Sequence, residues 1–273
     1  MTELESWRQR REDRLRAPTG WPSVVGLYWL KQGHNRVGSG SDADVKFPSP
    51  APEHVGTITL EPGRKTFTPA EGVGVQVDGV EVPSALILSD MDGGPTSMSW
   101  DSMVWYLIER QRRVAVRLKD TLSTARLSFS GLEYFPIRGD RIITGIFQAY
   151  DSVRTVPVPT VLGTPTEMSA PGFVEFEYAG KTHTLEVTGE DGDAAFFVIF
   201  GDETNGQETY HGGRFLVVDA PDESGRVQID FNRAYNPSCV FTDFATCPLP
   251  PSYNILTTRI EAGEKMYHSS GHG

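Results

Sequence analysis

A long succession of short β-type segments separated by turn residues is the feature that most constrains the fold of this chain. The segments are rich in Val, Ile, Thr and aromatic residues, and Gly, Pro or Asp separates them. They form two series, 55–60, 65–68, 74–77, 85–88, 103–109 and 113–119, then 141–150, 173–187, 194–200, 214–218 and 226–231. A proline-rich connector, 156–165, interrupts the second series. The pattern predicts an all-β protein with about fourteen short strands, either in two packed β modules or in one elongated β protein.

The N-terminus is the one place where helical periodicity is convincing. Residues 2–15 have one partly apolar side at helical spacing, and the remaining positions are mostly charged. That side carries Leu4, Trp7, Arg11 and Leu15. The spacing predicts a short helix that ends at a Pro/Gly-rich turn, and the five arginines of residues 8–16 are expected on a solvated face. The apolar run 21–30 is expected to pack against the core, because so many large apolar groups are unfavourable in water.

Composition excludes several classes of partner. The net charge is −11, with seven Lys/Arg against four Asp/Glu in residues 1–36 and 18 against 32 in the remainder. An acidic body repels phosphate backbones, so we expect no nucleic-acid partner. We expect no membrane contact either, because no apolar run is long enough to span a bilayer and no secretory cleavage site follows the N-terminus. With only two cysteines, the chain is expected in a reducing compartment, the cytoplasm.

Residues 35–90 carry polar and turn residues in a recognisable order. The matching positions are Gly38, Asp44-Val45, His54, Asp78-Gly79 and Leu88-Ser89-Asp90. This order resembles a forkhead-associated domain, which implies a β-sandwich that recognises phosphopeptides. Ser39 and the pair Ala51-Pro52 stand where that family has a phosphate-contacting arginine and a Ser-Arg pair. A phosphothreonine site needs charge-assisted donors, so the resemblance implies a sandwich with a degenerate phosphopeptide site.

A second resemblance extends over nearly the whole chain. It rests on 20–39, 208–216, 230–241, 247–254 and 261–267. These stretches resemble a bacterial family, domain of unknown function sixteen eighty-four, which brings no established activity. We therefore expect an N-terminal helix and apolar arm (1–32), a forkhead-associated-like β-sandwich (33–125), a second antiparallel β module that carries the candidate site (126–267) and a disordered tail (268–273).

The most chemistry-rich stretch is residues 228–254, where acidic, amide and tyrosine side chains accompany both cysteines and four prolines. Proline fixes φ and removes a backbone donor, which favours a rigid path that can hold side chains in place. With the neighbouring stretches, it supplies the candidate acid–base residues Asp230, Glu264, His211 and Tyr210. The candidate ligand-binding residues are Arg214, Asn232 and Asn236. The alternative is a segment that wraps the module and satisfies its backbone through Asn and Asp turns.

These residues predict that the second module binds a small polar or anionic molecule, with a hydrolytic activity as its extension. A protein-interaction module built on the first sandwich is the competing function. The cysteines lie eight positions apart, so a metal site would need His211 and a distant carboxylate, and a thiol nucleophile would need His211 as its base. Buried structural thiols are the alternative that we favour. No metal or cofactor is predicted, and the sequence leaves both enzymatic activity and oligomeric state open.

Overall fold

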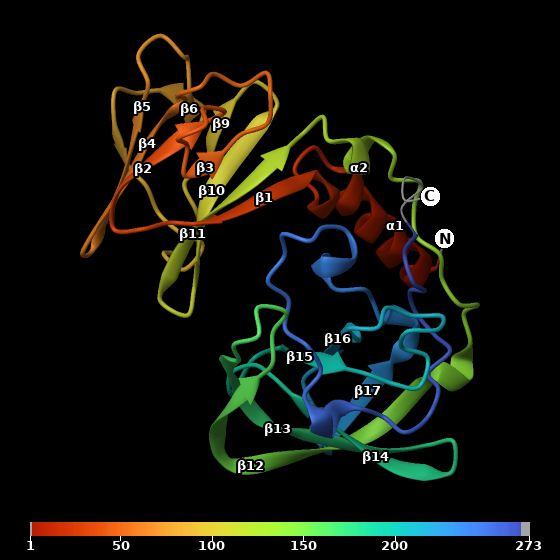
Figure 1. Cartoon of the computed structure of the whole chain (residues 1–273). Helices are drawn as coiled ribbons and strands as arrows, with labels where there is room; N and C mark the ends of the chain where they lie inside the picture. The colour runs from red at the N-terminus through yellow and green to blue at the C-terminus, as the bar shows by residue number, and fades with distance from the viewer. Residues whose placement is uncertain (1, 269–273) are drawn as a thin grey trace. The chain divides into compact units, whose positions relative to one another are not determined.

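The computed structural model describes residues 2–268. The chain divides into an N-terminal unit, residues 14–129, and a C-terminal unit, which combines residues 1–13 with 130–273. The boundary falls within helix α1 (Glu3–Arg16). Both units consist mainly of antiparallel strands, which confirms the predicted all-β class with an N-terminal helix (Figure 1). Most of the tail predicted at 268–273, namely 269–273, lies outside the described residues.

Two sheets form the N-terminal unit. The six-stranded sheet runs, in spatial order, β1 (Val24–Trp29), β11 (Arg113–Asp120), β10 (Met103–Arg110), β9 (Met98–Trp100), β6 (Gln76–Val77) and β7 (Val80–Glu81). The five-stranded sheet runs β3 (Val45–Lys46), β2 (Gly33–Gly38), β4 (Gly56–Glu61), β5 (Arg64–Pro69) and β8 (Ala85–Leu86). All ladders are antiparallel except that between β2 and β3. The apolar run 21–30 supplies η1 (Trp21–Ser23) and β1, and helix α2 (Thr124–Leu127) follows β11.

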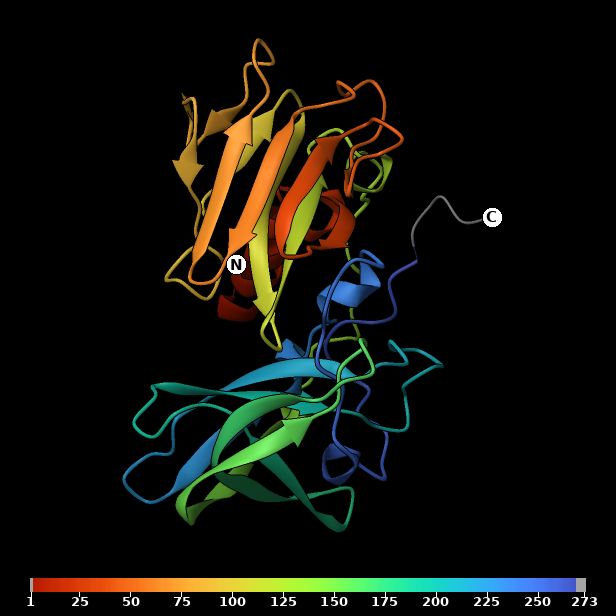
Figure 2. The same cartoon turned by 60° about the vertical axis from the view of Figure 1, so that its left-hand side comes forward.

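The core of the N-terminal unit lies between these two sheets (Figure 2). Trp105 of β10 is fully buried at its centre. Its ring centroid lies 4.9 Å from that of Phe47 and 5.9 Å from that of Phe67, and both contacts are edge-on. Phe47 follows β3 and Phe67 belongs to β5, so the indole joins the two layers into a sandwich.

The turn between β6 and β7 shows how the sequence specifies such short strands. Asp78 and Gly79 have φ of 48° and 82°, and Val77 pairs with Val80 across them. A two-residue hairpin of this type needs positive φ at both central positions, which Asp-Gly tolerates better than other pairs.

A four-stranded and a two-stranded sheet enclose the core of the C-terminal unit. The first runs β14 (Lys181–Val187), β13 (Thr166–Tyr178), β12 (Ile142–Val158) and β17 (Arg226–Asp230), and the second pairs β15 (Ala195–Phe200) with β16 (Arg214–Asp219). Phe231 is buried among them, with ring centroids 5.6 Å from Phe200 and 6.0 Å from Phe176. The short 3₁₀ turns are η2 (Gly139–Arg141), η3 (Phe231–Arg233), η4 (Ser238–Val240) and η5 (Ser252–Asn254).

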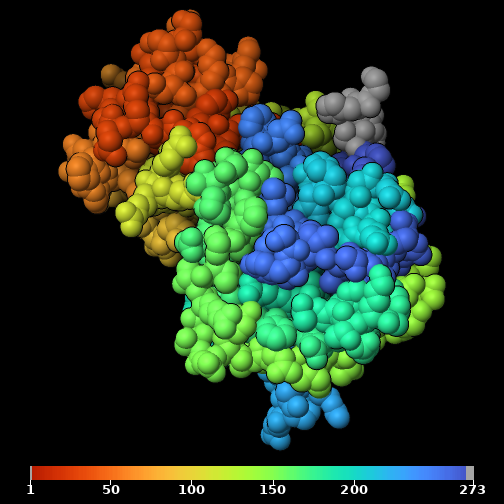
Figure 3. All heavy atoms as spheres, turned by 60° about the horizontal axis from the view of Figure 1, so that its bottom comes forward, coloured from red at the N-terminus to blue at the C-terminus, as the bar shows by residue number. Residues whose placement is uncertain are grey.

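Residues 231–268 contain no regular strand and pack across the C-terminal unit, with both buried and exposed side chains. They are fixed by backbone hydrogen bonds to distant segments, such as Leu249 N–H to the Pro159 carbonyl (2.7 Å), Leu256 N–H to the Gly201 carbonyl (2.8 Å) and Met266 N–H to the Glu208 carbonyl (2.8 Å). In Figure 3, blue atoms of this segment lie at the surface beside the green and cyan atoms of the strands. We refer to residues 231–268 as the wrapping segment. It includes most of the predicted site segment, 228–254.

α1 is the longest helix in the described part of the chain, with 14 residues. Because it is short and strongly charged, neither it nor any other helix there would reach across a membrane.

Candidate functional site

The amide side chain of Asn232 joins two segments of the C-terminal unit. It is fully buried in η3. Its Oδ1 accepts a hydrogen bond from the Arg138 N–H (3.1 Å), and its Nδ2 donates to the Arg138 carbonyl (3.0 Å). The carboxylate of Asp230 accepts from the backbone and side-chain nitrogens of Asn232 (3.0 and 2.9 Å) and lies 3.3 Å from Nε of Arg233. The structure therefore brings the predicted residues Asp230 and Asn232 together, with protein groups as their partners.

Two other predicted residues, Asn236 and Glu264, meet at helix α1. The Glu264 side chain is 0% exposed, and its Oε2 accepts from the Asn236 N–H (2.8 Å). Arg11 of α1 donates through Nε to Oε1 of Glu264 and through Nη2 to the Asn236 carbonyl (2.8 Å). A buried carboxylate needs a partner of opposite charge, and Arg11 supplies that partner to Glu264.

Arg8 lies on the same side of α1 and covers a tyrosine. Its Cζ is 4.1 Å from the ring centroid of Tyr134. Burial lowers the pKa of Arg8. Burial, and then the charge of Glu264, raises the pKa of Tyr134, so its hydroxyl stays protonated and can donate a hydrogen bond. We refer to the five residues Arg8, Arg11, Tyr134, Asn236 and Glu264 as the helix-α1 cluster.

Three buried polar atoms of the helix-α1 cluster have no hydrogen-bond partner among the described residues. They are Nε of Arg8, the hydroxyl of Tyr134 and Oδ1 of Asn236. Asn236 is only 1% exposed, and its Nδ2 donates to the Lys265 carbonyl (2.8 Å), which fixes the direction of Oδ1. Proteins pair more than about 90% of their buried polar groups, so these three atoms are exceptions that distinguish the helix-α1 cluster from the other polar groups described above.

Arg214 has a different environment. It is fully buried at the start of β16, where Nη2 binds Oδ2 of Asp202 at 2.7 Å and the Ile260 carbonyl at 2.8 Å. Nη1 donates to the Ala262 carbonyl. Burial lowers the pKa of Arg214, and the charge of Asp202 opposes that change. The guanidinium thus fastens residues 260–262 to β16.

Tyr210 and His211 lie together on the turn before β16, with ring centroids 4.3 Å apart. Burial raises the pKa of Tyr210, and the nearby Cys239 and Cys247 raise it further. The predicted site residues therefore form separate groups: Asp230 with Asn232, Asn236 with Glu264, Arg214 with Asp202, and Tyr210 with His211 near the cysteines. Within residues 2–268, no three His, Cys, Asp or Glu side chains are arranged to hold a metal ion.

In the N-terminal unit, the polar groups of loop 36–54 bind one another or a residue next to the loop. Nε of Arg36 lies 3.3 Å from a carboxylate oxygen of Asp42, and the Ser39 hydroxyl donates to the Ala51 carbonyl (2.6 Å). Nε2 of His54 lies 3.2 Å from the Thr57 hydroxyl. The one arginine of this loop thus faces an acidic side chain.

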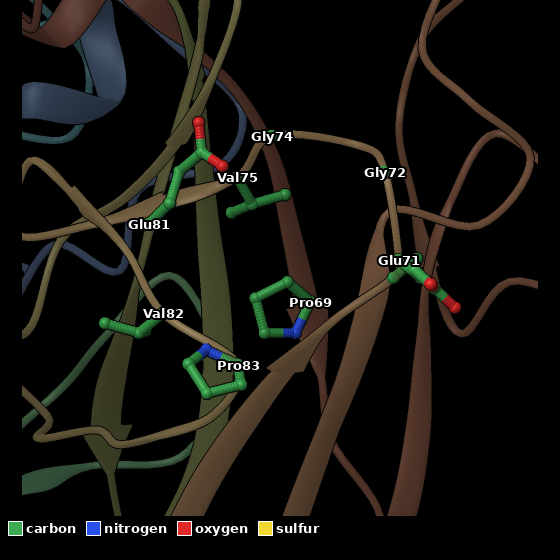
Figure 4. Close-up of a pocket in the computed structure, with 9 residues that line it drawn as sticks. Pro69, Glu71, Gly72, Gly74, Val75, Glu81, Val82 and Pro83 are labelled. Atoms are coloured by element: carbon green, nitrogen blue, oxygen red, sulfur yellow. The ribbon is translucent and has the colours of Figure 1, made fainter.

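A pocket of about 670 Å³ lies beside the β6–β7 hairpin of the same unit. Its walls include Pro69, Val75, Val82 and Pro83, and two acidic residues, Glu71 and Glu81, belong to its lining. Figure 4 shows the Glu81 carboxylate beside Val75, whereas the Glu71 carboxylate points away from the proline rings. The pocket therefore combines an apolar wall with negative charge at its edge.

Comparison with known proteins identifies a family for this chain. The family described as "Protein of unknown function (DUF1684)" matches residues 127–265. The chain belongs to this family. Its match covers the strands of the C-terminal unit and all but the last three residues of the segment 231–268. This range is shorter than the near end-to-end resemblance expected from the sequence. Tyr134, Asn236 and Glu264 lie within the DUF1684 range, and α1 lies outside it.

Two other comparisons add little to the DUF1684 assignment. No curated protein matches the sequence significantly. Among solved structures, the solution NMR structure of an uncharacterized protein from Haloarcula marismortui is 29% identical, covers 54% of this chain and 81% of its own, and has a TM-score of 0.44.

Three residues of the polar groups described above were not predicted from the sequence: Arg8 and Arg11 of the helix-α1 cluster, and Asp202, the partner of Arg214. The arginines were expected on a solvated face, but the Arg11 side chain is only 12% exposed. The one available signal was that Arg11 shares the partly apolar side of α1, where a charged side chain needs a partner. Asp202 lies in the acidic stretch 201–208, which matches no motif, so no local sequence pattern predicts that it pairs with Arg214.

Proposed function

We propose that the C-terminal unit binds a small polar anion at the helix-α1 cluster. The observation that carries this proposal is the set of three buried atoms without partners. Nε of Arg8 and the hydroxyl of Tyr134 are donors, and Oδ1 of Asn236 is an acceptor. A carboxylate or phosphate oxygen would accept from the two donors, and a hydroxyl or amino group of the same ligand would donate to Asn236. Small hydroxy or amino acids and phosphate esters have this combination.

The charges of the helix-α1 cluster agree with an anionic ligand. Arg11 neutralises Glu264 through its Nε, so Arg8 is the cation whose Nε remains available to a ligand. Both oxygens of Glu264 and both oxygens of Asp230 already face protein donors. A general base needs a lone pair directed at a reacting group. These contacts favour a binding role over a hydrolytic one for the two carboxylates.

Tyr134→Phe and Arg8→Met are expected to abolish or weaken this binding. A hydrogen bond to a charged group contributes about 1.5–3 kcal/mol, so each substitution should weaken affinity roughly 10- to 100-fold. Calorimetric titration of the full chain with phosphate, a hydroxycarboxylate and an amino acid measures the effect. Arg10→Met is the matched control, because Arg10 is exposed on the same helix.

An ordered water molecule is the competing occupant of the helix-α1 cluster. In that case none of the anions would bind, and Tyr134→Phe would leave the stability of the unit unchanged or raise it slightly, since it removes a buried polar group. Binding that is equally strong in the wild type, Tyr134→Phe and Arg8→Met would place the anion elsewhere and contradict the proposal.

A second candidate function belongs to the N-terminal unit, where we propose a protein-interaction module that binds at the pocket beside the β6–β7 hairpin. Apolar walls with acidic residues at the edge fit a lysine or arginine side chain, whose alkyl stem packs on proline and whose charged end reaches a carboxylate. The pairing of Arg36 with Asp42 favours such a basic partner over a phosphopeptide.

Glu81→Gln is expected to weaken binding of a lysine- and arginine-rich peptide. A partly solvated ion pair contributes about 0.2–1 kcal/mol, so the loss should be up to roughly fivefold and should diminish at high salt. Fluorescence anisotropy with basic, neutral and phosphothreonine peptides tests this, with Glu61→Gln as the control, because Glu61 is exposed at the end of β4. Preference for the phosphothreonine peptide would contradict the proposed partner and support a phosphopeptide module.

A further inference from the structure

The two cysteines of the chain, Cys239 and Cys247, lie against each other in the wrapping segment. Sγ of Cys247 accepts a hydrogen bond from the backbone N–H of Cys239, with an N–S distance of 3.2 Å. The two thiol side chains also hydrogen-bond to each other. A disulfide requires Cβ atoms about 3.5–4.5 Å apart, and a sulfur this close to the other residue's backbone is within reach of that residue's own sulfur.

The fold holds both residues of the pair in place. Cys239 is the middle residue of η4, whose start is fixed by Pro237 at φ −65°. Cys247 is anchored from the other side, because its carbonyl accepts from the Val161 N–H (3.1 Å) and the next residue, Pro248, forms a bridge with Thr160. The loop 240–246 therefore joins two fixed ends. The fold of the unit, and not the sequence spacing of the cysteines, brings the two residues together.

The two thiols differ in exposure. Cys247 is 6% exposed, whereas Cys239 is only half-buried. The side-chain hydrogen bond with the Cys239 thiol, and then burial, raises the pKa of Cys247. Thiolate character and access decide which cysteine an oxidant attacks. This asymmetry makes Cys239 the thiol that meets a reagent first and Cys247 the thiol that resolves the product.

We propose that Cys239 and Cys247 form a reversible intramolecular disulfide when the protein meets a hydroperoxide. Sγ of Cys239 attacks one peroxide oxygen, the O–O bond breaks, and Cys239 becomes a sulfenic acid while water, or an alcohol from an organic peroxide, leaves. Sγ of Cys247 then displaces the hydroxyl group from that sulfur, its own proton leaves with the hydroxyl as water, and the S–S bond forms. The two thiols are oxidised by two electrons, which reduce the peroxide. A low-molecular-weight thiol reverses the change by exchange.

This site is separate from the helix-α1 cluster, and its test needs no anion. The full chain is treated with a small excess of hydrogen peroxide, remaining thiols are alkylated, and peptides are weighed by mass spectrometry. In the wild type both thiols should disappear together, with a Cys239–Cys247 cross-linked peptide that has lost two hydrogen atoms. Dithiothreitol should restore both thiols. Because this first measurement uses only the wild type, it does not depend on how any variant folds.

Two variants then test the order of attack. Cys247→Ser should leave Cys239 as a sulfenic acid that dimedone traps, and Cys239→Ser should slow loss of the remaining thiol at least tenfold, because Cys247 is buried. Wild-type protein that keeps both thiols, forms only intermolecular dimers, or reaches irreversible Cys239 oxidation while Cys247 stays reduced would overturn the proposal. Faster oxidation of Cys247 in Cys239→Ser than of Cys239 in Cys247→Ser would overturn the assigned order.

Discussion

Arg214→Met is expected to destabilise the C-terminal unit by roughly 3–5 kcal/mol. The substitution keeps an unbranched apolar side chain but removes the cation that pairs with Asp202. Both side chains are 0% exposed, so the remaining carboxylate would lie in the protein interior without a counter-charge. The carbonyls of Ile260 and Ala262 would lose their guanidinium donor as well. Urea unfolding of the full chain measures the change, and hydrogen exchange of β16 shows that it belongs to this unit.

Two further variants identify the cause of this loss. Arg259→Met removes a cation that is 35% exposed and pairs with Glu208 and Glu261, so we expect a cost below about 1 kcal/mol. The double variant Arg214→Met/Asp202→Leu removes both buried charges and is expected to recover most of the stability lost by the single change. A double variant less stable than Arg214→Met would show that packing or carbonyl pairing, and not the unpaired charge, dominates.

The elements that the sequence predicted well are those whose signal is local. In the hairpin β13–β14, Val174 and Phe176 are buried and Glu175 and Glu177 are exposed, as their alternation requires. The turn between Tyr178 and Lys181 places Ala179 and Gly180 at positive φ. Such features need only the period of the strand and the chemistry of the turn.

The prolines of residues 156–165 led to a wrong prediction of where strand β12 ends. The sequence indicates a connector from residue 156, but β12 continues to Val158 and Pro157 pairs with Glu167 of β13. The partner on the other side, β17, pairs only with 142–146. At its far end β12 is thus an edge strand, where a residue that lacks an N–H donor is tolerated. Edge position depends on tertiary pairing, which the sequence pattern does not contain.

The sequence predicted a polar segment at 228–254, but it did not predict that the asparagine side chains there hydrogen-bond to the backbone of distant segments. Asn232, Asn236 and Asn254 each bind the backbone of a distant segment: Asn232 binds at Arg138, Asn236 at Lys265, and Asn254 at Glu186 and Ile199. A side-chain amide offers both a donor and an acceptor, so it can replace a strand ladder where a chain crosses a sheet. The two sequence-based interpretations, a wrapping segment and a site, therefore share the same residues. Of these three amides, only that of Asn236 favours a site over a wrapping segment, because its Oδ1 has no partner among residues 2–268.

The contact that joins helix α1 to the family-matched part of the chain gives the second large expected effect. Arg11 and Glu264 are 253 positions apart in sequence. Arg11→Met is expected to cost roughly 2–3 kcal/mol, the range for a hydrogen bond to a charged group with a partner left buried. Glu264→Gln keeps the shape of the side chain and should cost about 1–3 kcal/mol. Urea unfolding measures both, with Arg10→Met, exposed on the same helix, expected within about 0.5 kcal/mol of the wild type.

The double variant Arg11→Met/Glu264→Gln completes the cycle. Because Nε of Arg11 and Oε1 of Glu264 are in direct contact, we expect a coupling of about 1–3 kcal/mol, so the double variant loses less than the sum of the single losses. Protection of the α1 amides in hydrogen exchange should fall in the same order as stability, because the ion pair holds this helix against the rest of the unit.

Purely additive losses would mean that Arg11 holds α1 independently of Glu264. It would then act through the Asn236 carbonyl, or through the face of Tyr235 4.6 Å away. Such a result would leave Glu264 to be neutralised by another group, and Arg8 is the next cation of the helix-α1 cluster. The anion proposed there would then compete with Glu264 for Arg8, so this cycle also measures whether Arg8 is available to a ligand.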